Sequence, residues 1–158
     1  CGAGRYGVKA VDYLDNSNYF GIDSSISYIN IANEILNKTN PNKEFFLLID
    51  DKFQFDKFGV RFDFAIAQSV VTHITLHQFK TLIKNLNNVM NKGGVFLYTF
   101  IWHGIEIVEG FSDYGDLFMT KERYDPIVVN ELCKMMNINF YFVDLDHPSG
   151  QSTAVIQF

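Results

Sequence analysis

The sequence predicts an α/β domain in which helices cover both faces of a mostly parallel sheet. Three observations support this fold class: candidate strands and helices alternate along the chain, the strands are short apolar runs, and a glycine-rich turn precedes the first helix. Two final strand-like segments joined by turn residues predict an antiparallel C-terminal hairpin. This is the three-layer arrangement of Rossmann-like sandwiches. A chain of 158 residues suffices for one such domain, so we expect residues 1–158 to form a single domain.

The glycine-rich turn, residues 1–7 (CGAGRYG), stands at the very start of the sequence. In open α/β sheets a turn of this kind joins the first strand to the first helix, and its glycines let the backbone approach a nucleotide or nucleoside. No strand-like run precedes it here. We therefore expect a domain that is N-terminally incomplete and lacks its first strand.

The elements after this turn follow in alternating order. Residues 18–23 form a strand-like run, followed by Ser24 and Ser25 as good N-caps and by apolar residues at helical spacing from Ile26 to Leu36. The continuous apolar runs 45–49 and 62–67 are typical of strands that are covered on both faces.

The clearest helix follows Thr75. Thr75 and Gln78 form a capping box, and Gly93 is predicted as the glycine that ends this helix, before a strand over 95–101. Residues 102–119 show no clean period and are expected to cover the sheet edge where ligands bind. A helix from Pro126 to Met136 comes next. Strands over 140–145 and 153–158 close the chain.

Composition excludes several classes of function. The net charge is −5 and no dense basic run occurs, which argues against a nucleic-acid partner. The apolar runs are far shorter than the roughly 20 residues that cross a bilayer, so no membrane association is expected. No secretory signal is visible, which predicts a cytoplasmic location, and abundant Asn, Ile, Lys and Phe favour a bacterial source. Cys1 and Cys133 lack metal-ligand spacing; no metal is expected, and Cys133 is predicted to be a small buried residue.

The glycine spacing narrows the cofactor to two classes. Gly2, Gly4 and Gly7 match the dinucleotide fingerprint, and Asp23 follows Gly4 by 19 positions, near the roughly 20 expected of an acid that binds ribose hydroxyls. Nicotinamide nucleotides and S-adenosylmethionine both carry this ribose. The glycine pattern alone does not choose between them.

Almost the whole chain resembles the class I S-adenosylmethionine-dependent methyltransferases of the small-molecule type. Residues 1–5 are similar to the end of that family's glycine loop, and residues 19–25 to its second strand with the ribose-binding acid. Three further segments resemble the family's fourth-strand motif, the turn into its fifth strand and its reversed final strand: residues 62–74, 91–97 and 147–152.

This resemblance implies S-adenosyl-L-methionine as cofactor and methyl donor, and it implies roles for particular residues. The implied cofactor-binding residues are Cys1, Gly2, Ala3 and Gly4 of the turn, Asp23 and Ser24 at the ribose, Asp50, Asp51, Lys52 and Phe53 near the adenine, and Gln68. Which of Asp50 and Asp51 meets the adenine stays open, as does whether Gln68 lines the cleft or only ends its strand. His73 and His103 are the candidate catalytic bases or acceptor contacts, with local packing as the alternative for each.

The resemblance and the acidic charge together predict a small-molecule methyl acceptor. A sugar, a polysaccharide or a natural-product intermediate are candidates, methylated at oxygen or nitrogen, and a protein acceptor stays open. Two other functions remain: a nicotinamide-dependent oxidoreductase, which the glycine spacing favours but the lack of a Tyr-x-x-x-Lys pair disfavours, and a non-catalytic methyltransferase-like binding domain. The sequence gives no indication of the oligomeric state.

Overall fold

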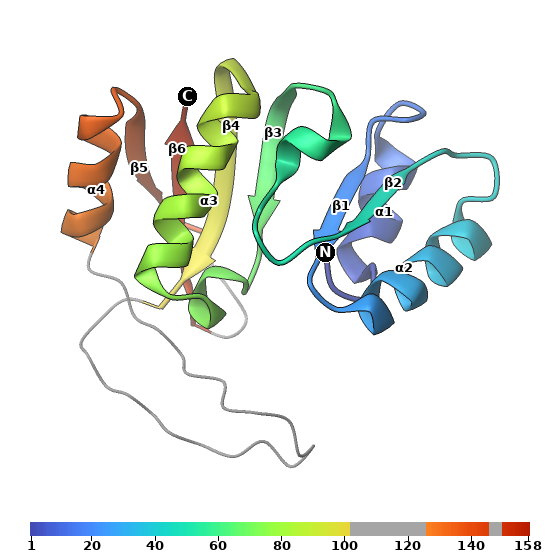
Figure 1. Cartoon of the computed structure of the whole chain (residues 1–158). Coiled ribbons are helices and arrows are strands. Elements are labelled where there is room, and N and C mark those ends of the chain that lie inside the picture. Colours follow the sequence, from blue (N-terminus) through green and yellow to red (C-terminus); the bar gives the residue numbers. More distant parts are fainter. Residues whose placement is uncertain (102–125, 146–149) are drawn as a thin grey trace. The chain divides into compact units, whose positions relative to one another are not determined.

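The computed structural model describes residues 1–101, 126–145 and 150–158 (Figure 1). The chain divides into two compact units, unit 1 with residues 1–59 and unit 2 with residues 60–158, and each is described by itself. Helices and strands alternate in both, so the predicted α/β class is confirmed. Among the described residues, no helix has the length and apolar character that crossing a bilayer requires. His103 and the whole of the aperiodic segment 102–119 lie outside the described residues.

Unit 1 contains two parallel strands, two α-helices and the short 3₁₀ helix η1 (Phe55–Phe58). Strand β1 (Phe20–Asp23) pairs with β2 (Phe46–Ile49), and Asp23 lies opposite Ile49 at the carboxyl end of both. Helix α1 (Arg5–Tyr13) follows the glycine-rich turn, and α2 (Ile26–Thr39) begins after Ser25, whose hydroxyl accepts a hydrogen bond from the Tyr28 N–H. The predicted apolar spacing of α2 is confirmed by its buried residues, which are Ile29, Ala32 and Leu36.

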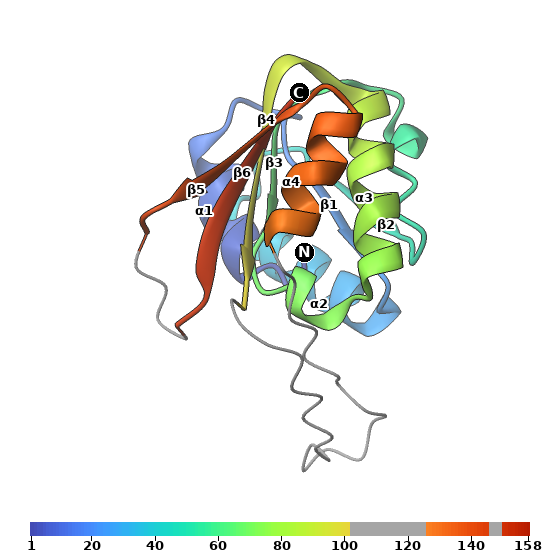
Figure 2. The same ribbon diagram turned by 90° about the vertical axis from the view of Figure 1, so that its left-hand side faces the viewer.

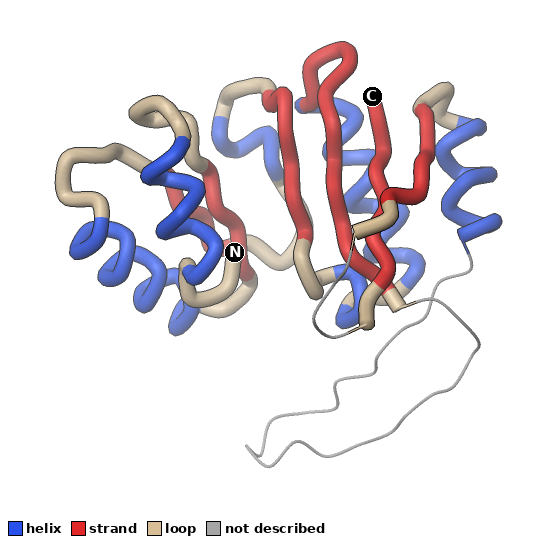
Figure 3. The backbone as a smooth tube through the Cα atoms, turned by 180° about the vertical axis from the view of Figure 1, so that it is seen from behind, coloured by secondary structure: helices blue, strands red, loops and turns tan. Residues whose placement is uncertain are grey.

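Unit 2 contains a mixed four-stranded sheet in the order β3-β4-β6-β5 (Figure 3). The strands are β3 (Phe62–Ala67), β4 (Met90–Phe100), β5 (Asn139–Val143) and β6 (Ser152–Gln157). Strand β3 runs parallel to β4, whereas β6 is antiparallel to both β4 and β5. The predicted C-terminal hairpin is therefore confirmed. Within the described residues β1 and β3 each pair with one strand, while the expectation of a missing first strand and that of a single domain stay predictions.

Both described α-helices of unit 2 lie on the same face of its sheet (Figures 1 and 2). Helix α3 (Leu76–Val89) packs Phe79 against Tyr98 of β4, with ring centroids 5.1 Å apart. Helix α4 (Pro126–Met135) contributes Cys133, which is fully buried as predicted. The core of unit 2 lies between these helices and the side chains that β4 and β6 direct toward them, including Phe96, Ala154 and Ile156.

The start of α3 matches its prediction, but its end does not. Thr75 and Gln78 form the expected capping box. The prediction that Gly93 ends the helix is wrong, because α3 stops at Val89 and β4 begins at Met90. The Arg61 guanidinium donates to the carbonyls of Asn88 and Met90 and so satisfies backbone acceptors at the helix end. Gly93 instead adopts φ 82° within β4, and its N–H donates to the Phe158 carbonyl at 2.6 Å.

Candidate functional site

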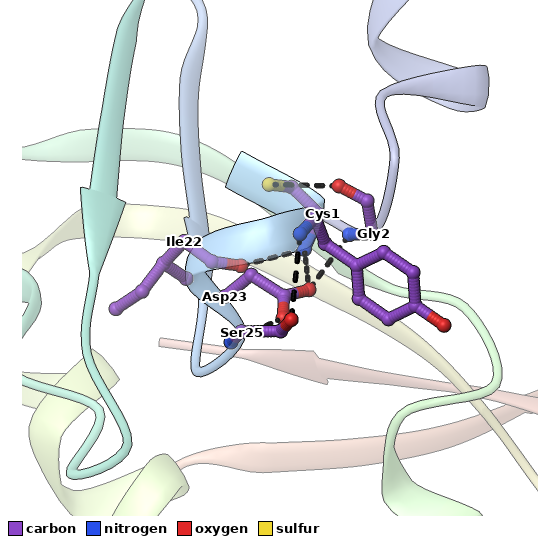
Figure 4. A network of polar contacts seen from close by, with 6 residues as sticks. Cys1, Gly2, Ile22, Asp23 and Ser25 are labelled. Atoms are coloured by element: carbon purple, nitrogen blue, oxygen red, sulfur yellow. Dashed lines mark hydrogen bonds and ion pairs between the residues drawn. The ribbon is translucent and has the colours of Figure 1, made fainter. Parts of the chain in front are cut away.

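The carboxylate of Asp23 holds the glycine-rich turn against the end of β1 (Figure 4). Its Oδ2 accepts hydrogen bonds from the Gly2 N–H at 2.8 Å and from the Cys1 nitrogen at 3.3 Å. Its Oδ1 accepts a hydrogen bond from the Ser25 N–H at 3.0 Å, next to the start of α2. One side chain therefore joins the turn, the strand end and the beginning of the second helix.

These contacts keep Asp23 ionised. Burial alone would raise the pKa of Asp23, but the hydrogen bonds from the Ser25 and Gly2 N–H groups lower it overall. Three donors use three of the roughly four lone-pair positions of a carboxylate. The side chain is 18% exposed, so the remaining position is accessible to a hydroxyl group of a ligand.

The glycines of the turn have different surroundings. Gly4 adopts φ 79°, and a Cβ there would stand 3.1 Å from the Ala32 Cα, so this glycine allows the turn to pack on α2. Gly2 also has a positive φ, 55°, but a Cβ there would meet nothing within 4 Å. Gly2 thus leaves open space beside Asp23, as expected where a ligand approaches the backbone.

Asp50 organises the loop after β2. Its Oδ2 accepts from the backbone N–H groups of Lys52 at 2.8 Å and Gln54 at 3.0 Å, and its Oδ1 accepts from the Lys57 Nζ at 3.0 Å. The Asp50 side chain is only 2% exposed. This loop holds Phe53 at φ 57°. The Asp50 carboxylate therefore stabilises this loop through its hydrogen bonds, whereas the neighbouring Asp51 is exposed to solvent.

Two groups of predicted cofactor residues come together in unit 1. Cys1 and Gly2, at the start of the turn, contact Asp23 at the end of β1, with the exposed Ser24 beside it, and residues 50–53 follow β2. Because β1 and β2 are parallel neighbours, both groups stand at the same edge of their sheet. This is the edge at which open α/β sheets bind ligands.

Gln68 and His73 belong to unit 2, at the carboxyl end of β3. Gln68 follows the last strand residue, Ala67, and is exposed. His73 is exposed at the end of the short 3₁₀ helix η2 (Val71–His73), and its backbone N–H donates to the Val70 carbonyl at 2.9 Å.

Three residues that the sequence analysis did not select also meet at the carboxyl end of β3: Ser69, Thr99 and Gln151. Within residues 1–101, 126–145 and 150–158, no group of three or more His, Cys, Asp or Glu side chains is placed to hold a metal ion.

The family follows from comparison with known proteins. A family model described as "Methyltransferase domain" matches residues 1–96, which is more than half of the chain and includes the turn, Asp23 and β3. The chain belongs to this methyltransferase family. The predicted resemblance, the enzyme class and the cofactor, S-adenosyl-L-methionine, are thereby confirmed.

Solved methyltransferase structures share the fold at low sequence identity. An S-adenosylmethionine-dependent methyltransferase from Methanosarcina mazei aligns with a TM-score of 0.74 and 13% identity over 99% of this chain and 88% of its own. A second one, from Clostridium acetobutylicum, has a TM-score of 0.73 and 15% identity, over 100% of this chain and 81% of its own.

Magnesium protoporphyrin IX methyltransferase from Synechocystis, with bound SAM, gives a TM-score of 0.72 at 11% identity. The alignment covers 99% of this methyltransferase domain and 66% of the Synechocystis protein, so the domain spans about two thirds of that relative. No curated protein matches the chain.

Proposed function

We propose that this domain transfers a methyl group from S-adenosyl-L-methionine to an oxygen or nitrogen of a small molecule. The observation that carries the proposal is the Asp23 carboxylate, which anchors the Gly2 N–H and keeps one lone-pair position accessible. A carboxylate at this strand end suits the ribose hydroxyls of the cofactor. Cys1, Ala3, Gly4 and Ser24 contribute backbone around it.

Asp51, Lys52 and Phe53 are proposed as the adenine contacts. Asp50 acts through the loop, because its carboxylate oxygens already accept three hydrogen bonds within it. Phe53 is half-buried and held in a left-handed conformation, which fixes the direction in which its ring leaves the backbone. An aromatic ring held in this way offers a surface on which a purine can stack.

The cofactor supplies a methyl group on a sulfonium, which is already activated for transfer. The chain therefore has no need of a nucleophile; it binds and orients the two reactants and excludes water. For a hydroxyl acceptor, a general base assists, and an imidazole has a suitable pKa near neutrality. We propose His73 or His103 for that role and Gln68 for the cleft beside the cofactor.

A small-molecule acceptor is supported by composition and by the names of the neighbours. The charge of −5 disfavours binding to a polyanion. The neighbours include magnesium protoporphyrin IX methyltransferase and a putative O-methyltransferase from Nostoc punctiforme. A sugar or a natural-product intermediate is the acceptor class that we would test first. A cytoplasmic location and a bacterial source are part of the same proposal.

Calorimetric titration of S-adenosylhomocysteine, and separately of NADH, tests the cofactor. We expect binding of S-adenosylhomocysteine and none of NADH. Methyl transfer is then measured with labelled S-adenosylmethionine against a panel of sugars, phenols and amines. RNA serves as a further acceptor arm, because one structural neighbour is a putative rRNA methylase. Binding without transfer to any acceptor would indicate a non-catalytic domain, and binding of NADH alone would reverse the assignment.

A further inference from the structure

Strand β5 forms one edge of the unit 2 sheet. It pairs with β6 along one side, and no other strand pairs with it in the described part of the chain (Figures 1 and 3). The peptide groups on its second side therefore have no strand partner among these residues. Such an edge is a template for a further strand, and proteins usually discourage that pairing with charged side chains, proline or a bulge.

Strand β5 has none of these protective features. Its residues, 139–143 (NFYFV), include no charged side chain and no proline. Its register with β6 runs without a shift from Asn139 to Val143. Tyr141 and Phe142 point to opposite faces of the sheet, because successive strand residues alternate, and they remain 49% and 48% exposed. The edge is therefore regular and apolar on both faces.

Exposed apolar side chains continue this surface beyond both ends of β5. Met135, the last residue of α4, is 85% exposed and lies four positions before the strand. Leu145 lies two positions after the strand and is also exposed. A free strand edge together with exposed apolar side chains is typical of an interaction surface.

The sequence of β5 is complementary to itself when two copies run antiparallel. If they pair about Tyr141, this residue stands opposite its own counterpart, and Phe140 stands opposite Phe142 of the second copy. Aromatic pairs across two strands stabilise a sheet. Asp144 then lies opposite Ile138, so no two carboxylates face each other along the paired strands. This pairing suits a chain of net charge −5, whose copies otherwise repel each other.

We propose that a second copy of this chain binds β5 through its own β5, antiparallel and in register about Tyr141, and joins the two four-stranded sheets into one. A two-fold axis relates the copies, as in most dimers. The strands and their flanking side chains, Met135 and Leu145, make a small contact, which predicts a reversible dimer in the micromolar range. The proposal does not depend on the methyl-transfer reaction.

Sedimentation of the whole protein over a range of concentrations tests the dimer. The wild-type mass should rise from that of a monomer toward that of a dimer. Tyr141→Lys places two like charges opposite each other and should keep the protein monomeric. Tyr13→Lys is the matched control, because it makes the same exchange at the exposed end of α1, and it should associate like the wild type.

A mixture of two variants distinguishes lost pairing from a damaged fold. Tyr141→Glu should also be monomeric alone, but equal amounts of Tyr141→Glu and Tyr141→Lys should form a mixed dimer, because residue 141 of one copy faces residue 141 of the other. A variant that had failed to fold would not regain association in this way. Absence of the mixed dimer would contradict the register about Tyr141.

Cross-linking tests the same register without added charge. Residues directly opposite each other in antiparallel strands have Cα atoms about 4.5–5.5 Å apart, within the range that a disulfide bridges. In a Cys1→Ser background, Tyr141→Cys should form a disulfide-linked dimer on oxidation, whereas Tyr13→Cys should not. A wild type that stays monomeric at every concentration, or a dimer that Tyr141→Lys leaves intact, would overturn the proposal.

Discussion

Asp50 and Lys57 form an ion pair, with the Asp50 Oδ1 and the Lys57 Nζ 3.0 Å apart, across the loop that follows β2. The lysine is half in solvent, at 45% side-chain exposure, while the carboxylate is 2% exposed. Two backbone N–H groups complete the environment of this carboxylate. The loop that carries the proposed adenine contacts is thus organised around one buried negative charge.

Asp50→Asn should lower stability at neutral pH and reduce the acid sensitivity of the protein. Burial alone would raise the pKa of Asp50, but hydrogen bonds from the Gln54 N–H, the Lys57 ammonium and the Lys52 N–H lower it overall. A lowered folded-state pKa gives stability that is present above the unfolded value of about 3.9 and is lost as pH falls through the folded value.

Urea unfolding as a function of pH measures this effect. We expect Asp50→Asn to lose about 1.5–3 kcal/mol at pH 7, the range for hydrogen bonds to a charged group, with the difference from wild type vanishing in acid. Asp51→Asn is the matched control, because Asp51 is exposed and should change stability little. A loss at Asp50 that stays constant down to the acid limit would contradict the role of its charge.

Asp23→Asn should weaken cofactor binding. The asparagine keeps the size of the side chain but replaces one carboxylate oxygen by an N–H₂ group, which cannot accept from Gly2 or from Ser25. We expect S-adenosylhomocysteine affinity to fall by about 1.5–3 kcal/mol, measured by calorimetry. Ser24→Ala, at the exposed neighbour, is the control for side-chain removal at this turn. Unchanged affinity in a folded Asp23→Asn variant would remove Asp23 from the ribose site.

Gly2→Ala and Gly4→Ala should distinguish a glycine that gives a ligand access to the backbone from one that allows the turn to pack on α2. Both positions have positive φ, so each alanine costs roughly 1–2 kcal/mol of left-handed strain. Only at Gly4 would the new Cβ also press on the backbone of α2, at Ala32. Gly4→Ala should therefore lower the free energy of unfolding more than Gly2→Ala does. Gly2→Ala should lower S-adenosylhomocysteine affinity, because its added methyl group would occupy the space beside Asp23 that the ligand approaches. The reverse order in urea unfolding would contradict this division of roles.

Cys133 should be unreactive in the folded protein. Burial raises the pKa of its thiol to about 11, so the thiolate at pH 8 amounts to roughly 0.1% of the population. In a Cys1→Ser background, a thiol-specific reagent should modify Cys133 only at the rate at which α4 opens, and urea should accelerate the reaction. Rapid labelling in the native state would show that α4 is not packed on its sheet as described.

The elements that sequence predicted best are those with strong local patterns. The capping box at Thr75, the burial of Ile29, Ala32 and Leu36, and the pairing of the C-terminal hairpin depend on residues close in sequence or on clear periodicity. The sequence analysis assigned Asp23 and the glycine turn to the same cofactor site, but it did not predict the hydrogen bond from the Gly2 N–H to Asp23. The different roles of Asp50 and Asp51 could not be predicted from the sequence, because they depend on the path of the backbone through Phe53.

The features that the sequence did not predict depend on contacts between segments that are far apart in the chain. Ser69 and Thr99 are 30 positions apart, and Thr99 and Gln151 are 52 apart, so no local pattern marks their hydrogen bonds. The end of α3 was missed for the same reason. Arg61 donates hydrogen bonds to the carbonyls of Asn88 and Met90, which lie 27 and 29 positions further along the chain. Gly93 instead lies in the irregular first part of β4.

The position of β6 between β4 and β5 determines the order in which the strands can pair during synthesis of the chain. Unit 1 can pair its two strands as soon as residue 49 has left the ribosome, because both lie in the first third of the chain. In unit 2, β5 pairs with β6 alone among the described strands, and β4 gains its second neighbour from the same segment. The nascent chain must therefore carry the open edge of β4 until residues 152–157 emerge, which makes this edge a natural contact for a chaperone.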